Sequence, residues 1–157
     1  MRLLIKEKVF TFTDQFTIMD EAGNDRYVVE GELFSFGKKL HVYDMAGNEV
    51  AYIEQVLFNF FPRYRVFVGD VQIAEVVREF SFFRPKYSVI GPGWDVDGSF
   101  WEHDYTVYRH EMPVVHFYKE WMTFGDFYTL DIKDPADEIQ ALALVLAIDC
   151  IIEQRNN

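Results

Sequence analysis

The sequence predicts a mainly β (α+β) fold: a closed antiparallel barrel of about twelve strands around a central hydrophobic C-terminal α-helix. Half of the residues are hydrophobic and 18 % are aromatic, which indicates a large core built from β-forming residues. Short turn motifs recur between runs of Ile, Val and Tyr, and the last long segment is apolar on every side. At 157 residues, the chain is expected to form one domain, 1–157.

The first strands are predicted by a repeated turn. "FTIMDEAGNDRYVV" and "LHVYDMAGNEVAYI" align without gaps, so that Asp20 and Gly23 correspond to Asp44 and Gly47. Aspartate accepts hydrogen bonds from the local backbone, and glycine adopts positive φ at no steric cost. Each copy therefore predicts two strands joined by a short turn.

A second repeat follows and overlaps the first. "AYIEQVLFNFFPRYRVF" matches "AEVVREFSFFRPKYSVI", and "VHFYKEWMTFGDFYTLDI" is a looser third copy. Each unit predicts a strand, an aromatic-rich corner and a returning strand that begins with Tyr64, Tyr87 or Tyr128. Bulky aromatic residues at the corners suit strands that turn at the end of a barrel. The strands are expected near residues 2–10, 15–20, 26–32, 38–45, 48–57, 63–68, 71–80, 85–91, 94–97, 100–109, 113–121 and 126–132.

The last segment predicts a helix with no polar face. Asp134 is a good N-cap, and Pro135 suits the first helical position. From Ile139 to Ile152 only Gln140 and Asp149 are polar, and they lie on opposite sides of a helix. Such a helix is either the centre of a core or a membrane span. Its length of about 21 Å falls short of a hydrocarbon layer of about 30 Å, which favours the barrel core. Asp149 is expected to pair with a cation or with backbone donors at the barrel mouth.

Composition excludes several classes of protein. The net charge of −11 repels phosphate backbones and so argues against nucleic-acid binding. A single cysteine, Cys150, leaves no internal disulfide and fits a reducing compartment. Charges at positions 6, 7 and 8 interrupt any signal-peptide core. The chain is therefore expected to be cytoplasmic and without a transmembrane span.

Three segments together carry a family resemblance: the turn "DEAGN", the strand–corner–strand "WMTFGDFYTLDI" and the terminal "ADEIQALALVLAIDCI". In their order and spacing they resemble the LURP-one-related family, whose bacterial members are called YxjI-like and share the Tubby C-terminal-like fold. The resemblance covers essentially the whole chain and implies a twelve-stranded barrel around a central hydrophobic helix. Its superfamily also includes the phosphoinositide-binding Tubby domains and the phospholipid scramblases.

Basic residues in the second repeat are the candidate binding site. Arg63 and Lys86 hold equivalent repeat positions and are expected to emerge at one end of the barrel. Arg65, Arg84, Lys38 and Lys39 complete the candidate site for an anion or lipid headgroup. The alternative is that these cations are solvated and balance an acidic surface.

No other pattern indicates a catalytic or metal site. "GPGWDVDGSFWEHDY" offers Asp95 and Asp97 as weak metal candidates, but the pattern of a calcium loop is incomplete. Its Asp-Gly-Ser is better explained as a hairpin turn, and His103 as an exposed strand residue. Neither a nucleophile elbow nor a phosphate or dinucleotide loop occurs, so no cofactor is predicted. A buried Cys150 would be a poor nucleophile.

The sequence therefore favours a soluble, non-enzymatic binding or scaffold domain. Its candidate ligand is an anionic lipid headgroup or a protein partner, bound at one barrel end. The alternative is a scramblase-like, membrane-associated protein, which needs a membrane-inserting helix. A hidden enzyme is the third possibility and predicts a deep pocket with perturbed titratable groups.

Overall fold

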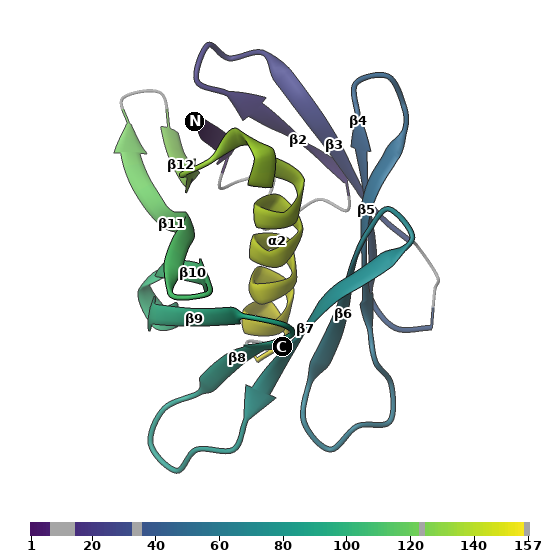
Figure 1. Cartoon of the computed structure of the whole chain (residues 1–157), viewed down its shortest axis with the longest axis vertical. Helices are drawn as coiled ribbons and strands as arrows, with labels where there is room; N and C mark the ends of the chain where they lie inside the picture. The colour runs from purple at the N-terminus through teal and green to yellow at the C-terminus, as the bar shows by residue number, and fades with distance from the viewer. Residues whose placement is uncertain (7–14, 33–35, 123–124, 156–157) are drawn as a thin grey trace.

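The computed structural model describes residues 1–6, 15–32, 36–122 and 125–155. The described strands form one twelve-stranded antiparallel sheet that curls around a single α-helix (Figure 1). The strands are β1 (Arg2–Lys6), β2 (Gln15–Asp20), β3 (Asp25–Gly31), β4 (Lys39–Asp44), β5 (Glu49–Gln55), β6 (Arg63–Val68), β7 (Val71–Glu79), β8 (Lys86–Ile90), β9 (Trp94–Ser99), β10 (Asp104–Arg109), β11 (Met112–Met122) and β12 (Gly125–Ile132). The remaining elements are two 3₁₀ turns, η1 (Phe100–Glu102) and η2 (Pro135–Asp137), and the helix α2 (Glu138–Arg155).

The sheet is a meander whose first and last strands meet. Consecutive strands are neighbours, and β1 pairs with β12 so that Leu3 lies opposite Leu130. The hydrogen-bonded order begins at β8 and ends at β9, and these two strands share no ladder. The predicted antiparallel barrel is confirmed, with a seam between β8 and β9 that leaves it nearly closed.

The two repeated turns have the same structure, as their sequences predicted. The Asp20 carboxylate accepts hydrogen bonds from the backbone N–H groups of Ala22 and Asn24, each at 2.9 Å. Asp44 makes the same pair of bonds at 3.0 and 2.9 Å. The hydrogen bond from the Asn24 backbone lowers the pKa of the Asp20 carboxyl. Both turns connect adjacent strands, β2 to β3 and β4 to β5.

The repeated strand–corner–strand units also form as predicted. Tyr64 and Tyr87 are the second residues of β6 and β8, whereas Tyr128 is the fourth residue of β12, and residues 123–124 of the third corner lie outside the described chain; all three tyrosines are buried. Their repeat partners eleven positions earlier, Ile53 and Phe117 among them, are buried as well. The repeat therefore marks side chains that point into the barrel, at matched positions on successive strands.

The predicted strand at 100–109 is wrong in its first four residues. Phe100–Glu102 form η1, His103 has a left-handed φ of 53°, and β10 begins only at Asp104. The predicted hairpin turn at Asp-Gly-Ser is wrong too, because residues 97–99 belong to β9. Gly98 is needed there for close approach: a Cβ would lie 2.5 Å from the Tyr105 Cα on the paired strand.

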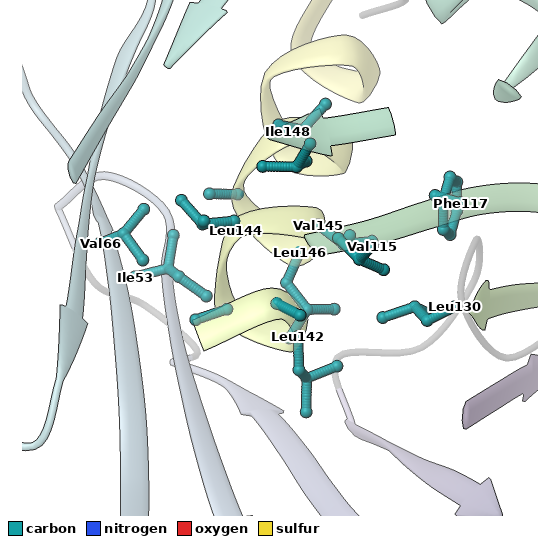
Figure 2. Close-up of a cluster of buried hydrophobic side chains, with 14 of the residues drawn as sticks. Ile53, Val66, Val115, Phe117, Leu130, Leu142, Leu144, Val145, Leu146 and Ile148 are labelled. Atoms are coloured by element: carbon teal, nitrogen blue, oxygen red, sulfur yellow. The ribbon is translucent and has the colours of Figure 1, made fainter. Parts of the chain in front are cut away.

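The helix α2 fills the barrel, as the sequence predicted. Every side chain from Ala141 to Ile148 is buried. Figure 2 shows leucines of the helix between Ile53 and Val66 on one wall and Phe117 on the opposite wall. The Asp134 carboxylate caps η2 by accepting from the Ala136 N–H, so η2 forms the first turn before α2 begins.

The barrel has two different ends. The turn end holds the β2–β3 and β4–β5 turns and the start of α2, where Arg26 donates from Nη2 to both Glu138 carboxylate oxygens at 2.9 and 3.0 Å. Because strand direction alternates, the β3–β4, β5–β6, β7–β8 and β9–β10 connections all lie at the opposite, loop end. The helix ends there too, since the Tyr64 hydroxyl donates to Gln154 Oε1 at 3.0 Å.

Candidate ligand-binding site at the barrel seam

A cavity of about 560 Å³ lies at the loop end, where the seam separates β8 from β9. This volume falls within the usual range for small-molecule sites. Its walls come from the β7–β8 loop, the β9–β10 connection and the last turns of the helix. It is lined by Phe83, Arg84, Pro85, Tyr87, Gly98, Ser99, Phe100, Glu102, His103 and Ile152.

The connection between β8 and β9 and the pairing of the two strands place the cavity here. Gly91, Pro92 and Gly93 join β8 to β9 in a tight connection, in which Trp94 N donates to Gly91 O at 3.2 Å. The two strands are therefore held together at the turn end, yet each is hydrogen-bonded only to its outer neighbour. Toward the loop end they diverge (Figure 1), and Phe100 of η1 contacts Tyr87 of β8 across the gap.

Aromatic rings form the inner wall of the cavity. The Phe100 ring lies 5.1 Å from that of Tyr87 and 5.5 Å from that of Tyr105, measured between centroids. Phe100 therefore links β8 to β10 across the seam by ring contact. These rings are largely apolar, while Arg84, Ser99 and Glu102 contribute polar groups to the lining.

Asp149 lies behind this wall. The side chain is buried, and its Oδ1 accepts no hydrogen bond from any described residue. The nearest basic atom is His103 Nδ1, 3.8 Å from Oδ1. Burial raises the pKa of the Asp149 carboxyl well above its usual range; the Glu153 charge adds to this, and Lys38 opposes it. Asp149 Oδ1 therefore has a basic neighbour in His103 but no hydrogen bond from the described chain, and His103 is not an exposed strand residue.

All six predicted basic residues lie at or near the loop end, but four of them face carboxylates on the outer wall. Arg63 pairs with Glu75, and Arg65 lies 3.7 Å from Glu54 and 3.6 Å from Glu75. Lys86 lies 3.3 Å from Glu79, and Lys39 lies 3.8 Å from Glu32. These pairs neutralise much of the charge that the sequence suggested was available to a ligand.

Lys38 and Arg84 differ from the other four. Arg84 lines the seam cavity, and Lys38 lies near enough to the helix end to lower the pKa of Asp149. Among the described residues, no carboxylate lies within salt-bridge distance of either side chain. Of the predicted site residues, these two are thus the ones best placed to meet an anionic ligand.

The weak metal candidates do not come together. Asp95 and Asp97 lie on the exposed face of β9, and Asp95 Oδ1 accepts from the Val96 N–H at 2.8 Å. Asp104 contacts His116 at 2.7 Å on a different strand pair. Within residues 1–6, 15–32, 36–122 and 125–155, no group of three His, Cys, Asp or Glu residues could hold a metal ion.

The sequence prediction missed a repeated pattern at the loop end. Phe-x-Phe occurs at 10–12, 34–36, 58–60 and 80–82, and a basic residue follows closely in the last three copies. The first copy and residues 34 and 35 lie outside the described part of the chain. The described phenylalanines of this pattern are largely exposed, and the sequence prediction gave no account of that exposure. The spacing of Phe-x-Phe was the available signal.

Two further observations concern the helix. Burial raises the pKa of the Cys150 thiol to about 12, so this cysteine is unreactive near neutral pH. In the described part of the chain, no helix has the length and apolar character required to cross a bilayer.

Comparisons with known proteins agree with the architecture. A family model described as LURP-one-related matches residues 1–149. A Bacillus subtilis (strain 168) relative, uncharacterized protein YxjI, is 31 % identical over 152 residues, which cover 97 % of this chain and 94 % of that protein. A solved Arabidopsis thaliana protein has the same fold, with a TM-score of 0.61 and 20 % identity over 95 % of this chain and 90 % of its own. The chain belongs to the LURP-one-related family.

Proposed function

We propose that this protein is a non-enzymatic binding domain that takes the anionic headgroup of a lipid at the loop end of its barrel. The observation that carries the proposal is the position of Arg84 at the seam cavity, without a described carboxylate partner. A guanidinium presents a planar fork of donors that matches the oxygens of a phosphate or carboxylate. Lys38 supplies a second positive charge at the same end.

The charge distribution supports this choice of ligand. The chain carries a net charge of −11, so a stretch without acids is informative. Residues 36–38, 56–62 and 80–85, which belong to three loops at one end, contain Lys38, Arg84 and no carboxylate, while Glu102 of the β9–β10 connection also lines the cavity. Local cations near an anionic surface contribute about 1 kcal/mol each.

We propose no reaction for the cavity. Histidine acts as a catalytic base when a carboxylate ion holds its ring, whereas burial favours the neutral form of Asp149. The scramblase-like alternative requires α2 to enter a bilayer. That movement would expose the wall residues that α2 now covers, so we favour binding from the surface.

Vesicle co-sedimentation tests the proposal. We expect binding to phosphatidylcholine vesicles that contain anionic lipid at physiological salt, and weaker binding to pure phosphatidylcholine. The double substitution Lys38→Ala and Arg84→Ala should weaken binding by about 2 kcal/mol, about thirtyfold. Arg65→Ala is the matched control, because Arg65 is already engaged by wall carboxylates.

Three results would count against the proposal. Equal binding to neutral and anionic vesicles would show that the negative charge of the headgroup does not contribute to binding. An Arg65→Ala effect as large as that of the double variant would show general charge attraction instead of a site. Lipid mixing between leaflets catalysed by the purified protein would favour the scramblase-like alternative.

A further inference from the structure

We infer that the loop end carries a set of phenylalanine tips that insert into the apolar layer of a membrane, with the barrel standing on the bilayer. The inference rests on the proposed function. It adds to the headgroup contact a second one, between phenylalanine rings and the hydrocarbon of the bilayer. The tips are the described phenylalanines of the β3–β4, β5–β6 and β7–β8 loops: Phe36, Phe58, Phe60, Phe61, Phe80, Phe82 and Phe83.

The first argument is exposure. Phe83, Phe60 and Phe58 are 97 %, 93 % and 91 % exposed, and Phe82 is 85 % exposed. Single exposed apolar residues are ordinary, but a contiguous group of large ones marks an interaction site. Phe61 is the least exposed of the tips at 37 %, and none of the seven belongs to the buried core cluster.

The second argument is that the tips form a connected surface. Ring contacts join Phe60 to Phe61 at 4.8 Å, Phe61 to Phe80 at 6.3 Å, and Phe80 to Phe82 at 4.8 Å. This chain of rings connects the β5–β6 loop to the β7–β8 loop. A separate contact at 6.0 Å, between Phe36 and Phe58, connects the β3–β4 loop to the β5–β6 loop.

The third argument is that the backbone holds the tips outward. Phe58 has a φ of 63°, which is unusual for a bulky residue and is retained only where the surroundings impose it. The base of the same loop is closed by a hydrogen bond from Val56 N to Arg63 O at 2.9 Å. A second bond runs from Arg78 N to Pro62 O at 3.1 Å and fixes the loop to β7.

The shape and charge of this end select a bilayer as the partner. The β5–β6 and β7–β8 loops extend beyond the end of α2 as convex fingers (Figure 1). Lys38 and Arg84 lie within the loops themselves, and the acidic turns that contain Asp20 and Asp44 lie at the opposite end. An anionic surface therefore attracts the loop end and repels the turn end. Aromatic tips with adjacent cations match the layered chemistry of a membrane interface.

Depth-dependent quenching tests the inference. Buried Cys150, whose thiol pKa is raised to about 12, resists labelling, so an introduced surface cysteine can carry a fluorophore selectively. The probe is attached to Phe60→Cys or Phe83→Cys, and to Ala46→Cys at the turn end as the control. With anionic vesicles, we expect both tip probes to shift to the blue and to be quenched by brominated acyl chains. The Ala46→Cys probe should remain unquenched.

A substitution pair provides a second measurement. The double variant Phe60→Ser and Phe83→Ser should bind vesicles about tenfold more weakly or worse, because two apolar anchors are lost. Its folding should be unchanged, since both rings are exposed. Met45→Ser is the matched control, because Met45 is 55 % exposed at the turn end.

The possible outcomes separate this inference from the proposed function. Charge-dependent binding without quenching at either tip would overturn insertion and leave headgroup binding intact. Quenching that is equal in neutral vesicles and insensitive to Arg84→Ala would support insertion and overturn headgroup binding. A blue shift without vesicles that grows with protein concentration would assign the tips to self-association and overturn insertion. Absence of vesicle binding would overturn both.

Discussion

Asp149 is the residue whose surroundings fit its chemistry least. It is an acid on an apolar helix, and its Oδ1 accepts no hydrogen bond from the described chain. The raised pKa means that the folded state holds the proton more tightly than the unfolded chain does. The contribution of protonated Asp149 to the free energy of unfolding is therefore complete below the ordinary carboxyl pKa of about 3.9. It is lost as the pH rises through the raised folded value.

Asp149→Asn should remove this pH dependence. We expect the variant to be more stable than the wild type at pH 8 and the difference to shrink toward pH 4, by about 1.4 kcal/mol for each unit of pKa elevation. Urea unfolding across that pH range measures the difference. Asp70→Asn, in an exposed turn, controls for the loss of one charge. A difference that does not vary with pH would show that Asp149 is ionised in the folded protein.

Gly98 gives a second test at the residue scale. Gly98→Ala places a Cβ 2.5 Å from both the Asp104 carbonyl oxygen and the Tyr105 Cα, at a φ of 143°. We expect a loss of about 3 kcal/mol or more in the free energy of unfolding. Gly23→Ala at φ 84° meets nothing within 4 Å and should cost only about 1 kcal/mol. Thermal melts of both variants make the comparison, and equal losses would contradict it.

Single residues were the least predictable feature of this protein. Asp-Gly-Ser has ordinary turn chemistry, but Gly98 serves the approach of β10 to β9, which is a contact between strands. His103 was read as a strand residue, because neither a 3₁₀ turn nor a left-handed residue is marked by local sequence here. Asp20 and Asp44 were predictable, since their hydrogen bonds stay within five residues.

At the scale of elements, α2 is the determinant of stability. Leu144 and Leu146 are buried against the barrel wall. Leu144→Asp should prevent folding, because it places an unpaired charge in the core. Leu144→Ala should fold and cost about 2–5 kcal/mol.

Circular dichroism and thermal melts measure both effects. Val71→Asp, at a position 65 % exposed, should change the free energy of unfolding by no more than about 0.5 kcal/mol. If Leu144→Asp kept the wild-type melting temperature, the helix would not lie inside the barrel.

Most elements could be predicted because their signals are local and repeated. The helix carries its own N-terminal cap at Asp134 and has no polar face, so both its start and its burial follow from sequence. The exposed Phe-x-Phe tips could not be predicted in the same way. Whether an aromatic corner folds over the barrel mouth or extends past it depends on loop geometry, such as the positive φ of Phe58.

At the scale of the whole molecule, the seam is the weakest part of the barrel. Strands β8 and β9 each have one hydrogen-bonded neighbour, whereas β1 and β12 each have two. Hydrogen exchange should therefore be faster in β8 and β9 than in β1 and β12, with a tenfold difference for each 1.4 kcal/mol of opening free energy. Mass spectrometry of exchanged fragments measures this order. Equal protection of all four strands would indicate that the seam is closed in solution.

The barrel was predictable from the number of hairpins and the apolar helix, but the seam was not. A three-residue connection such as Gly91–Gly93 normally predicts two paired strands. Here the strands diverge because η1 and the aromatic wall occupy the space between them. The seam cavity arises from that long-range packing, so the candidate site was predictable only as a set of charges at one barrel end.

The position of α2 in the chain has a consequence for synthesis. The twelve strands of the barrel wall are translated before α2. The nascent chain therefore carries their inward-facing apolar side chains before the helix that covers them has been synthesised. Folding of the nascent chain must therefore wait for Leu142–Ile152 to emerge, unlike in proteins whose N-terminal half folds first. A chain truncated before Asp134 would lack α2, so the apolar inner face of the wall would stay uncovered and the product would aggregate. Only chains that include the helix can therefore fold.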